Sequence, residues 1–286
     1  MVQAVKLSDL TNRKRRAKED EIKEDSESEI DISSTDSEGE NESDDSDDDD
    51  DDEELVNIDF DFFNGNPEID FHAMKNLMRQ LLGPQVSNRV QLSSLADLIL
   101  SSPTTTIKTD GPESDPYCFL SFIDYKDNKE TDWARYLHKV DLRISTFLKT
   151  IEKSDKKCAL VATERLINMP PEVITPLYRI TLEDVQKALG DEQNYDFYVF
   201  VSRKYEVNFD MDIEDDEGMD KSARSKKRVR SAEVEYFHEE DRFLEKYSKV
   251  HFDSEARKGV INSYIVIDHE NLVKAIAELE QAVSTW

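Results

Sequence analysis

Residues 157–202 decide the fold class, and they read KCALVATERLINMPPEVITPLYRITLEDVQKALGDEQNYDFYVFVS. Residues 157–163 and 195–202 are short apolar runs of the length that is typical of buried strands. Between them, residues 181–190 (TLEDVQKALG) predict a capped helix. A strand followed by a helix and then by another strand is typical of α/β domains.

The same alternation extends in both directions. Upstream, Val56, Ile58, Phe60 and Phe62 alternate with polar residues and predict a half-buried strand. A helix over 67–83 should end at Gly83-Pro84, and a shorter helix is expected over 94–101. Residues 117–124 predict a buried strand, and an apolar stripe predicts one long helix from about residue 133 to 151. Downstream, a strand (261–268) and a helix (269–283) are expected. The fold class is therefore α/β, with a mixed central sheet flanked by helices.

Charge divides the chain into two parts. Its net charge is -28, and residues 19–54 contain 22 acids against one lysine, Lys23. So acidic a segment with few apolar residues cannot bury enough surface to offset its chain entropy. We expect residues 1–54 to form a disordered tail, a basic cluster followed by an acidic run, and residues 55–286 to form a single α/β domain. Within that domain, residues 210–230 contain seven acids followed by six Lys/Arg and predict a charged surface loop.

Two short basic clusters stand out in this acidic chain. They predict import signals for transport receptors, and hence a nuclear protein with shuttling to the cytoplasm; the alternative is incidental charge on exposed chain. Two isolated cysteines, no signal peptide and no apolar run of membrane length also indicate a reducing cytosolic or nuclear location and no membrane association. The clusters are Arg13, Lys14, Arg15, Arg16 and Lys226, Lys227, Arg228, Arg230.

No motif for catalysis is recognisable. The seven glycines are far apart in sequence, so neither a dinucleotide fingerprint nor a P-loop can be built. The histidines lack paired metal spacing, and no G-x-S-x-G elbow exposes a nucleophile. The sequence thus predicts no catalytic residue, no cofactor and no metal site. Direct nucleic-acid binding is disfavoured as well, because so acidic a chain repels phosphate.

Four segments together resemble the BCCIP family of nuclear eukaryotic proteins, and the chain resembles its fungal member. They are LVNIDFDFF (55–63), ALVATERLINMPPEV (159–173), YDFYVFVSRKY (195–205) and SAEVEYFHEEDRFLEKY (231–247). The resemblance implies a sandwich similar to the GNAT acetyltransferases without their activity, and no Q/R-x-x-G-x-G/A turn for acetyl-CoA exists here. It further implies a non-enzymatic chaperone for a basic large-subunit ribosomal protein, with a role in ribosome biogenesis and in nuclear export of cargo that includes a lipid kinase. The alternative is an acyltransferase-like enzyme with an unrecognised cofactor site.

The acidic run itself indicates how a basic client is bound. Residues Asp47, Asp48, Asp49, Asp50, Asp51 and Asp52 carry one carboxylate each, and an extended chain rises about 3.3–3.6 Å per residue. This spacing approximates that of the phosphates of a nucleic-acid strand, about 3.4 Å. We therefore expect the acidic run to cover the RNA-binding surface of a basic client. The alternative is a tail that only keeps the protein soluble. An acid follows three residues after each predicted phosphorylation site, Ser26, Ser28, Ser33, Thr35, Ser37 and Ser46.

Inside the domain, TERLINMPP (163–171) is the predicted partner contact. Thr163, Glu164, Arg165 and Asn168 follow a buried strand, at the end of a sheet where α/β folds place their sites. The alternative is structural, with Thr163 capping a helical turn and Arg165 paired to a carboxylate. Residues 235–247 add four aromatics among charges, some of which must be core.

Overall fold

The computed structural model describes residues 58–190, 193–207 and 233–285, which from Asp59 onward belong to one compact unit. The predicted tail (1–54) and the predicted loop at 210–230 lie outside the described residues. The helices are α1 (Phe71–Ser87), α2 (Leu92–Leu100), α3 (Asp132–Val140), α4 (Leu142–Glu152), the 3-10 turn η2 (Pro171–Val173), α5 (Ile174–Leu189), α6 (Asp241–Lys246) and α7 (His269–Val283). The strands are β1 (Asp61–Asn64), β2 (Thr104–Lys108), β3 (Cys118–Asp124), β4 (Cys158–Arg165), β5 (Phe197–Val207), β6 (Glu233–Tyr236), β7 (Val250–Asp253) and β8 (Val260–Asp268).

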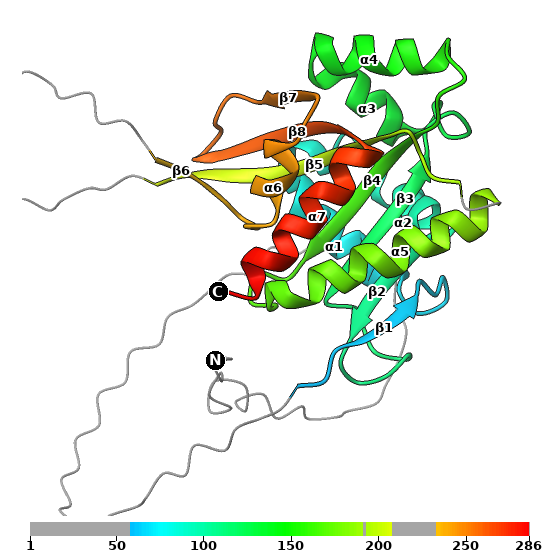
Figure 1. Cartoon of the computed structure of the whole chain (residues 1–286), viewed down its shortest axis with the longest axis vertical. Helices are drawn as coiled ribbons and strands as arrows, with labels where there is room; N and C mark the ends of the chain where they lie inside the picture. Colours follow the sequence, from blue (N-terminus) through cyan, green and yellow to red (C-terminus); the bar gives the residue numbers. More distant parts are fainter. Residues whose placement is uncertain (1–57, 191–192, 208–232, 286) are drawn as a thin grey trace, which may run out of the picture. The chain divides into compact units, whose positions relative to one another are not determined.

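The strands form one mixed sheet in the order β1-β2-β3-β4-β5-β8-β7, and β6 also pairs with β5 (Figure 1). Within the described residues, β4 and β5 are the parallel pair, and the other pairings are antiparallel. Parallel strands need a crossover connection, and α5 supplies it between β4 and β5. The predicted fold class, α/β with a mixed central sheet, is confirmed. The likeness to GNAT enzymes stays a prediction.

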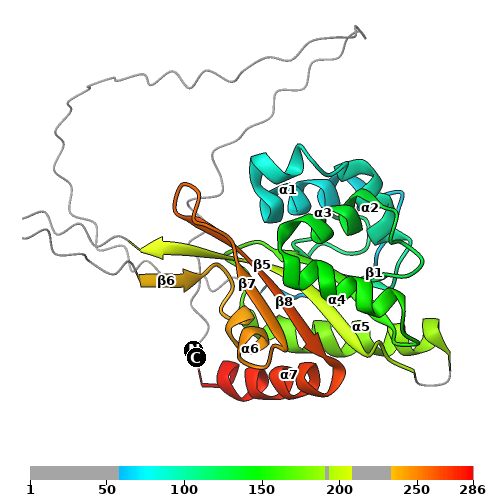
Figure 2. The same ribbon diagram turned by 90° about the horizontal axis from the view of Figure 1, so that it is seen from above.

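Helices cover both faces of the sheet, with α1–α4 on one side and α5–α7 on the other (Figure 2). Alternate strand residues divide between the two cores, because successive side chains of a strand point to opposite faces. On β5, Val199 and Val201 join the core under α1–α4, whereas Tyr198 and Phe200 join the core under α5–α7. Each strand at the centre of the sheet is thus buried on both faces, which is why these strands read as continuous apolar runs.

The prediction of one long helix over 133–151 is wrong, because the helix is interrupted at Asp141. Asp141 has extended backbone angles (φ -155°, ψ 150°), and its carboxylate accepts a 2.8 Å hydrogen bond from the backbone N–H of Arg143. Asp141 therefore caps the start of α4, as Asp does at many helix N-termini. The apolar stripe was real, since Trp133, Leu137, Ile144 and Leu148 are all buried, but it belongs to two helices that pack on one core.

Other boundaries differ from the sequence predictions for local reasons. The predicted stop of α1 at Gly83 is a kink (φ 67°, ψ 171°), and Pro84 starts a further turn that ends at Ser87. Helix α5 begins at Ile174 rather than near residue 181, and Thr181 is buried, donating to the carbonyl oxygen of Leu177. Strand β2 was missed because TTTIK is mostly polar; its Thr104 hydroxyl donates to the carbonyl oxygen of Ile99. No helix among the described residues is long and apolar enough to cross a membrane.

Candidate partner-binding site

The parallel strands β4 and β5 diverge after three residue pairs, from Cys158–Phe197 to Leu160–Val199. Farther along β5, the strand β6 takes the place of β4, pairing from Lys204 to Val207. The carboxyl end of β4 therefore opens a crevice against β5, bridged by the turn after β6, whose Phe237 N–H donates to the carbonyl oxygen of Arg203. Ligands of open α/β sheets commonly bind in such crevices.

A network of charged side chains fills this crevice. The guanidinium of Arg165 donates from Nε and Nη2 to the two carboxylate oxygens of Glu240, at 2.7 and 3.0 Å. Glu164 accepts from Arg203 Nη2 at 2.7 Å, and its other oxygen lies 2.6 Å from His238 Nε2. Bidentate, charge-assisted bonds of this kind are strong and geometrically specific. The side chains come from three segments distant in sequence, so the network ties β4, β5 and the turn after β6 together.

Burial and hydrogen bonding shift the pKa values of two groups in the crevice. It raises the pKa of the Asp241 carboxyl to about 7, helped by the neighbouring charge of Glu240, although the Ser202 hydroxyl donates to that carboxyl. Burial alone would lower the pKa of His238, but its hydrogen bond to Glu164 outweighs this and raises the pKa. Both groups therefore hold their protons more tightly in the folded protein than in the unfolded chain.

The crevice leaves little free space. The cavity between Glu164, Arg165, His238 and Asp241 has a volume of about 20 Å³, enough for about one water molecule. Cys118 also borders it, and burial holds the pKa of this thiol far above its usual range. A thiol that stays protonated is a poor nucleophile. The crevice at the carboxyl end of β4 is therefore filled by interacting protein side chains, and its cavity is too small for a cofactor.

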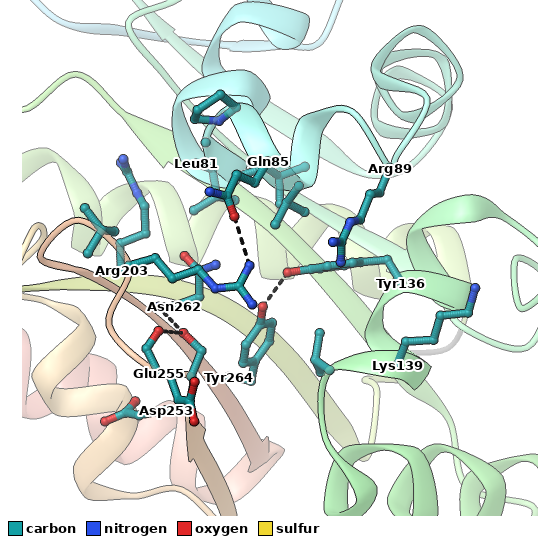
Figure 3. A pocket seen from close by; sticks show the side chains of 18 of the residues that line it. Leu81, Gln85, Arg89, Tyr136, Lys139, Arg203, Asp253, Glu255, Asn262 and Tyr264 are labelled. Atoms are coloured by element: carbon teal, nitrogen blue, oxygen red, sulfur yellow. Dashed lines mark hydrogen bonds between the residues drawn. The ribbon is translucent and has the colours of Figure 1, made fainter.

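A much larger cleft lies next to the crevice, with a volume of about 1290 Å³ (Figure 3). Its walls are the end of α1 with the connection to α2, helix α3, and the strands β5, β7 and β8 with the turn between β7 and β8. Arg203 and Leu81 border both cavities. Arg203 also donates from Nη1 to the carbonyl oxygen of Gln80 at 2.9 Å, in the last turn before the Gly83 kink. The ion network of the crevice therefore holds one wall of the cleft.

Tyrosines form part of the cleft floor, and cations predominate among its charged residues. The hydroxyls of Tyr136 and Tyr264 are hydrogen-bonded to each other, and the side chain of Arg89 lies beside Tyr136 (Figure 3). Burial raises the pKa of Tyr136, although the charges of Arg89 and Arg257 oppose this. The cations that line the cleft are Arg89, Arg135, Lys139, Arg203, Arg257 and Lys258, and the acids are Asp132, Asp253 and Glu255. A mostly basic cleft is notable in a chain of net charge -28.

Among the described residues, the side chains of Glu245, His251 and Asp253 form a cluster that could coordinate a metal ion. Lys204 already occupies the carboxylate oxygens of this cluster, because its Nζ lies 2.5 Å from Glu245 Oε2 and 2.9 Å from Asp253 Oδ2. A cation would have to displace this buried ammonium group, whose side chain is 5% exposed. The cluster is therefore a structural ion pair, and we assign no metal to it.

The structure separates the predicted contacts of TERLINMPP. Glu164 and Arg165 belong to β4 itself and are buried, whereas Asn168 is exposed in the turn that follows, beside Ile167, which is 69% exposed. Thr163 caps no helical turn; its hydroxyl donates to the carbonyl oxygen of Phe119. Partner binding by Glu164, Arg165 and Asn168 stays a prediction, and a partner at this edge would meet Ile167 and Asn168 first. Asp47–Asp52, the two basic clusters and the six phosphorylation sites lie outside the described residues.

Sequence reasoning missed the cleft. Its walls come from four segments between residues 80 and 264, and Tyr136 lies within the stretch 133–151, for which the sequence predicts only an apolar helix. One local signal was available: Arg257 and Lys258 precede Gly259 in the turn between β7 and β8, and both Lys258 (φ 54°) and Gly259 (φ 77°) have left-handed backbone angles. A basic turn of this kind in an acidic chain indicates an exposed, charged surface.

Comparison with known proteins gives consistent matches. The family model described as BCCIP matches residues 55–244. Protein BCP1 of Saccharomyces cerevisiae is 68% identical over 290 residues, covering 100% of both chains, and protein bcp1 of Schizosaccharomyces pombe is 39% identical over 196 residues, covering 64% of this chain and 68% of that one. Among solved structures, the crystal structure of BCP1 from Saccharomyces cerevisiae matches with a TM-score of 0.70 and 63% sequence identity, covering 84% of this chain and 95% of that chain.

Proposed function

Since the chain belongs to the BCCIP family, we propose that it is a non-enzymatic nuclear chaperone for a basic large-subunit ribosomal protein. In this role it supports ribosome biogenesis, escorts its client until assembly, and takes part in nuclear export of protein cargo that includes a lipid kinase. Transport receptors that read Arg13–Arg16 and Lys226–Arg230 deliver it to the nucleus.

The observation that carries this proposal is the charge of residues 19–54. From Asp47 to Glu54 every residue is an acid, so the carboxylates follow one another at about the spacing of nucleic-acid phosphates. Such a segment attracts the RNA-binding surface of a ribosomal protein over long range and competes with RNA for it. A folded domain next to the segment adds shape-specific contacts to this attraction.

The crevice at the end of β4 supports a non-enzymatic role. Its volume of about 20 Å³ is far below the 300–1,000 Å³ or so of small-molecule sites, and buried ion pairs line it. Thermal melts with and without acetyl-CoA test the acyltransferase alternative. A cofactor site would raise the Tm in proportion to the logarithm of ligand concentration, and a rise of this form would overturn the non-enzymatic assignment.

The escort function is tested by binding kinetics against a purified basic large-subunit ribosomal protein over a salt series. Three forms are compared: the full chain, a deletion of residues 19–54, and a control of full length in which the acids of 19–54 are replaced by Asn and Gln. Loss of charge should lower the association rate and flatten its salt dependence in both variants alike. Free RNA should displace the client from the full chain.

Equal association rates for all three forms would show that the acidic segment is only a solubility device. A defect in the deletion but not in the Asn/Gln control would assign the effect to chain length rather than charge. Absence of client binding by the full chain at low salt would refute the escort function itself.

A further inference from the structure

The cleft of Figure 3 has cations at its rim that form no ion pair with the carboxylates of the described residues. Arg203 is bound to Glu164, and Arg135 lies near Glu130 and Asp132. By contrast, Arg89, Lys139 and Lys258 form no ion pair with any carboxylate in the described parts of the chain, and all three are exposed. The guanidinium of a fourth cation, Arg257, donates to the neutral amide oxygen of Gln85 at 2.9 Å and pairs with no carboxylate of the described residues.

Apolar and aromatic side chains lie between these cations. Val86, Val140, Phe252 and Val260 line the cleft and are half-buried, so each retains apolar surface at its wall. Exposed apolar surface rimmed by charge is typical of a binding site for another protein. The volume of about 1290 Å³ also exceeds the range of small-molecule sites, up to about 1,000 Å³.

The aromatic rings of the cleft already have stacking partners. Tyr136 stacks on Trp133 with ring centroids 5.7 Å apart, and Phe252 stacks on Tyr264 at 6.0 Å. The guanidinium of Arg143 lies over Phe252, 5.3 Å from the ring centroid. Single-stranded nucleic acids bind proteins largely by stacking bases on free aromatic faces. These occupied rings favour an acidic peptide over a single-stranded nucleic acid as the ligand of the cleft.

We propose that this cleft binds an acidic segment of a partner protein, in which Asp or Glu residues alternate with apolar side chains. The carboxylates pair with Arg89, Lys139, Arg257 and Lys258 at the rim, and the apolar side chains contact the valines and Phe252 between them. This interaction is separate from the proposed escort function, because a basic client is repelled by these cations. The two surfaces therefore select partners of opposite charge.

The test measures binding of a short fluorescent peptide of Asp and Glu alternating with Leu and Phe to the full-length protein. The comparison probes are the same peptide with Asn and Gln in place of its acids, and a single-stranded oligouridylate of equal charge. The variant is Arg89→Glu with Lys139→Glu. The matched control is Lys149→Glu with Lys153→Glu, since these lysines are exposed near the end of α4 and do not line the cleft.

We expect the acidic peptide to bind and the amide peptide to bind much more weakly. The cleft variant should raise the peptide Kd by about tenfold, because two attractive pairs become repulsive, whereas the control variant of equal net charge should leave the Kd nearly unchanged. Melting temperatures check that both variants fold.

Three results would overturn the proposal. The first is absence of peptide binding by the unmodified protein at low salt. The second is an equal loss of affinity in the cleft variant and in the control variant, which would make the effect one of net charge. The third is tighter binding of the oligouridylate through Arg89 and Lys139, which would assign the cleft to nucleic acid.

Discussion

Replacing Arg165 by Met should destabilise the fold strongly, because it leaves the carboxylate of Glu240 without its partner. Both side chains of this pair are 7% exposed, and the Nη1 of Arg165 also donates to the carbonyl oxygen of Met169 at 2.9 Å. Removing one partner of a buried ion pair costs about 3–5 kcal/mol. For a domain of this size, that loss corresponds to a fall in Tm of roughly 6–20 °C.

The exposed pair between Arg179 and Glu280 offers a matched control, since its side chains are 57% and 48% exposed. Arg179→Met removes the same chemical group from a solvated pair and should cost about 0–1 kcal/mol. Urea unfolding followed by the fluorescence of the buried Trp133 measures both variants. The double variant Arg165→Met with Glu240→Leu removes both charges and should recover most of the lost stability, because an apolar pair of similar volume needs no compensation.

Two results would refute this reasoning. If Arg165→Met costs no more than Arg179→Met, the crevice is solvated and the pair contributes no more than a surface contact. If the double variant is as unstable as Arg165→Met alone, the loss comes from packing or from the Met169 carbonyl rather than from the unpaired carboxylate of Glu240.

Three further predictions concern pH, localisation and modification. Asp241 and His238 should make stability fall between about pH 4 and pH 8, because the pKa of Asp241 is raised to about 7 and that of His238 is also raised, so each group binds its proton more tightly in the folded state. The lowered pKa values of His138 and His269 act in the opposite direction. The melting temperature of the Asp241→Asn variant should depend less on pH than that of the unmodified protein. The melting temperature of the control variant, with the exposed His72 replaced by Gln, should keep the original dependence on pH. Replacing the basic residues of 13–16 and 226–230 by Ala should abolish nuclear accumulation of a fluorescent fusion too large to diffuse; undiminished accumulation would contradict the import signals. Phosphopeptide mapping of protein from cells should find Ser26, Ser28, Ser33, Thr35, Ser37 and Ser46 modified, each phosphate adding about -1.5 to -2 charges, and unmodified sites would count against an acidophilic kinase.

Much of the fold follows from hydrophobic patterns. The runs 117–124, 157–163, 195–202 and 261–268 correspond, within two residues at their starts, to the strands β3, β4, β5 and β8, and the helix 269–283 has the predicted bounds. The prediction of one long helix failed where a single polar residue overrides a pattern. Asp141 interrupts a continuous apolar stripe because its carboxylate caps a new helix, and a periodicity of apolar residues carries no information about that cap.

The sites were less predictable than the fold, because each is assembled from distant segments. Arg165 and Glu240 are 75 residues apart, and the Tyr136–Tyr264 contact joins residues 128 apart. From sequence, the polar residues at the end of an apolar strand indicated an exposed site. In the structure, β4 continues through Arg165, and a turn more than 70 residues later supplies the side chains that pair with Glu164 and Arg165. The polar residues at the end of this strand therefore form a buried ion network rather than an exposed site.

This difference changes how the predicted contact at TERLINMPP can be studied. Glu164 binds Arg203, and Arg203 in turn donates to the carbonyl oxygen of Gln80, in the last turn of α1 before the Gly83 kink, at the wall of the cleft. Removing Glu164 or Arg165 would therefore disturb the crevice and the cleft together, and any loss of binding would have two explanations. Ile167 and Asn168 are exposed in the turn beyond β4, so substitutions there change what a partner meets while the ion network stays intact. The side chains of this segment that hold the fold and those that can contact a partner are thus neighbours in sequence but different residues.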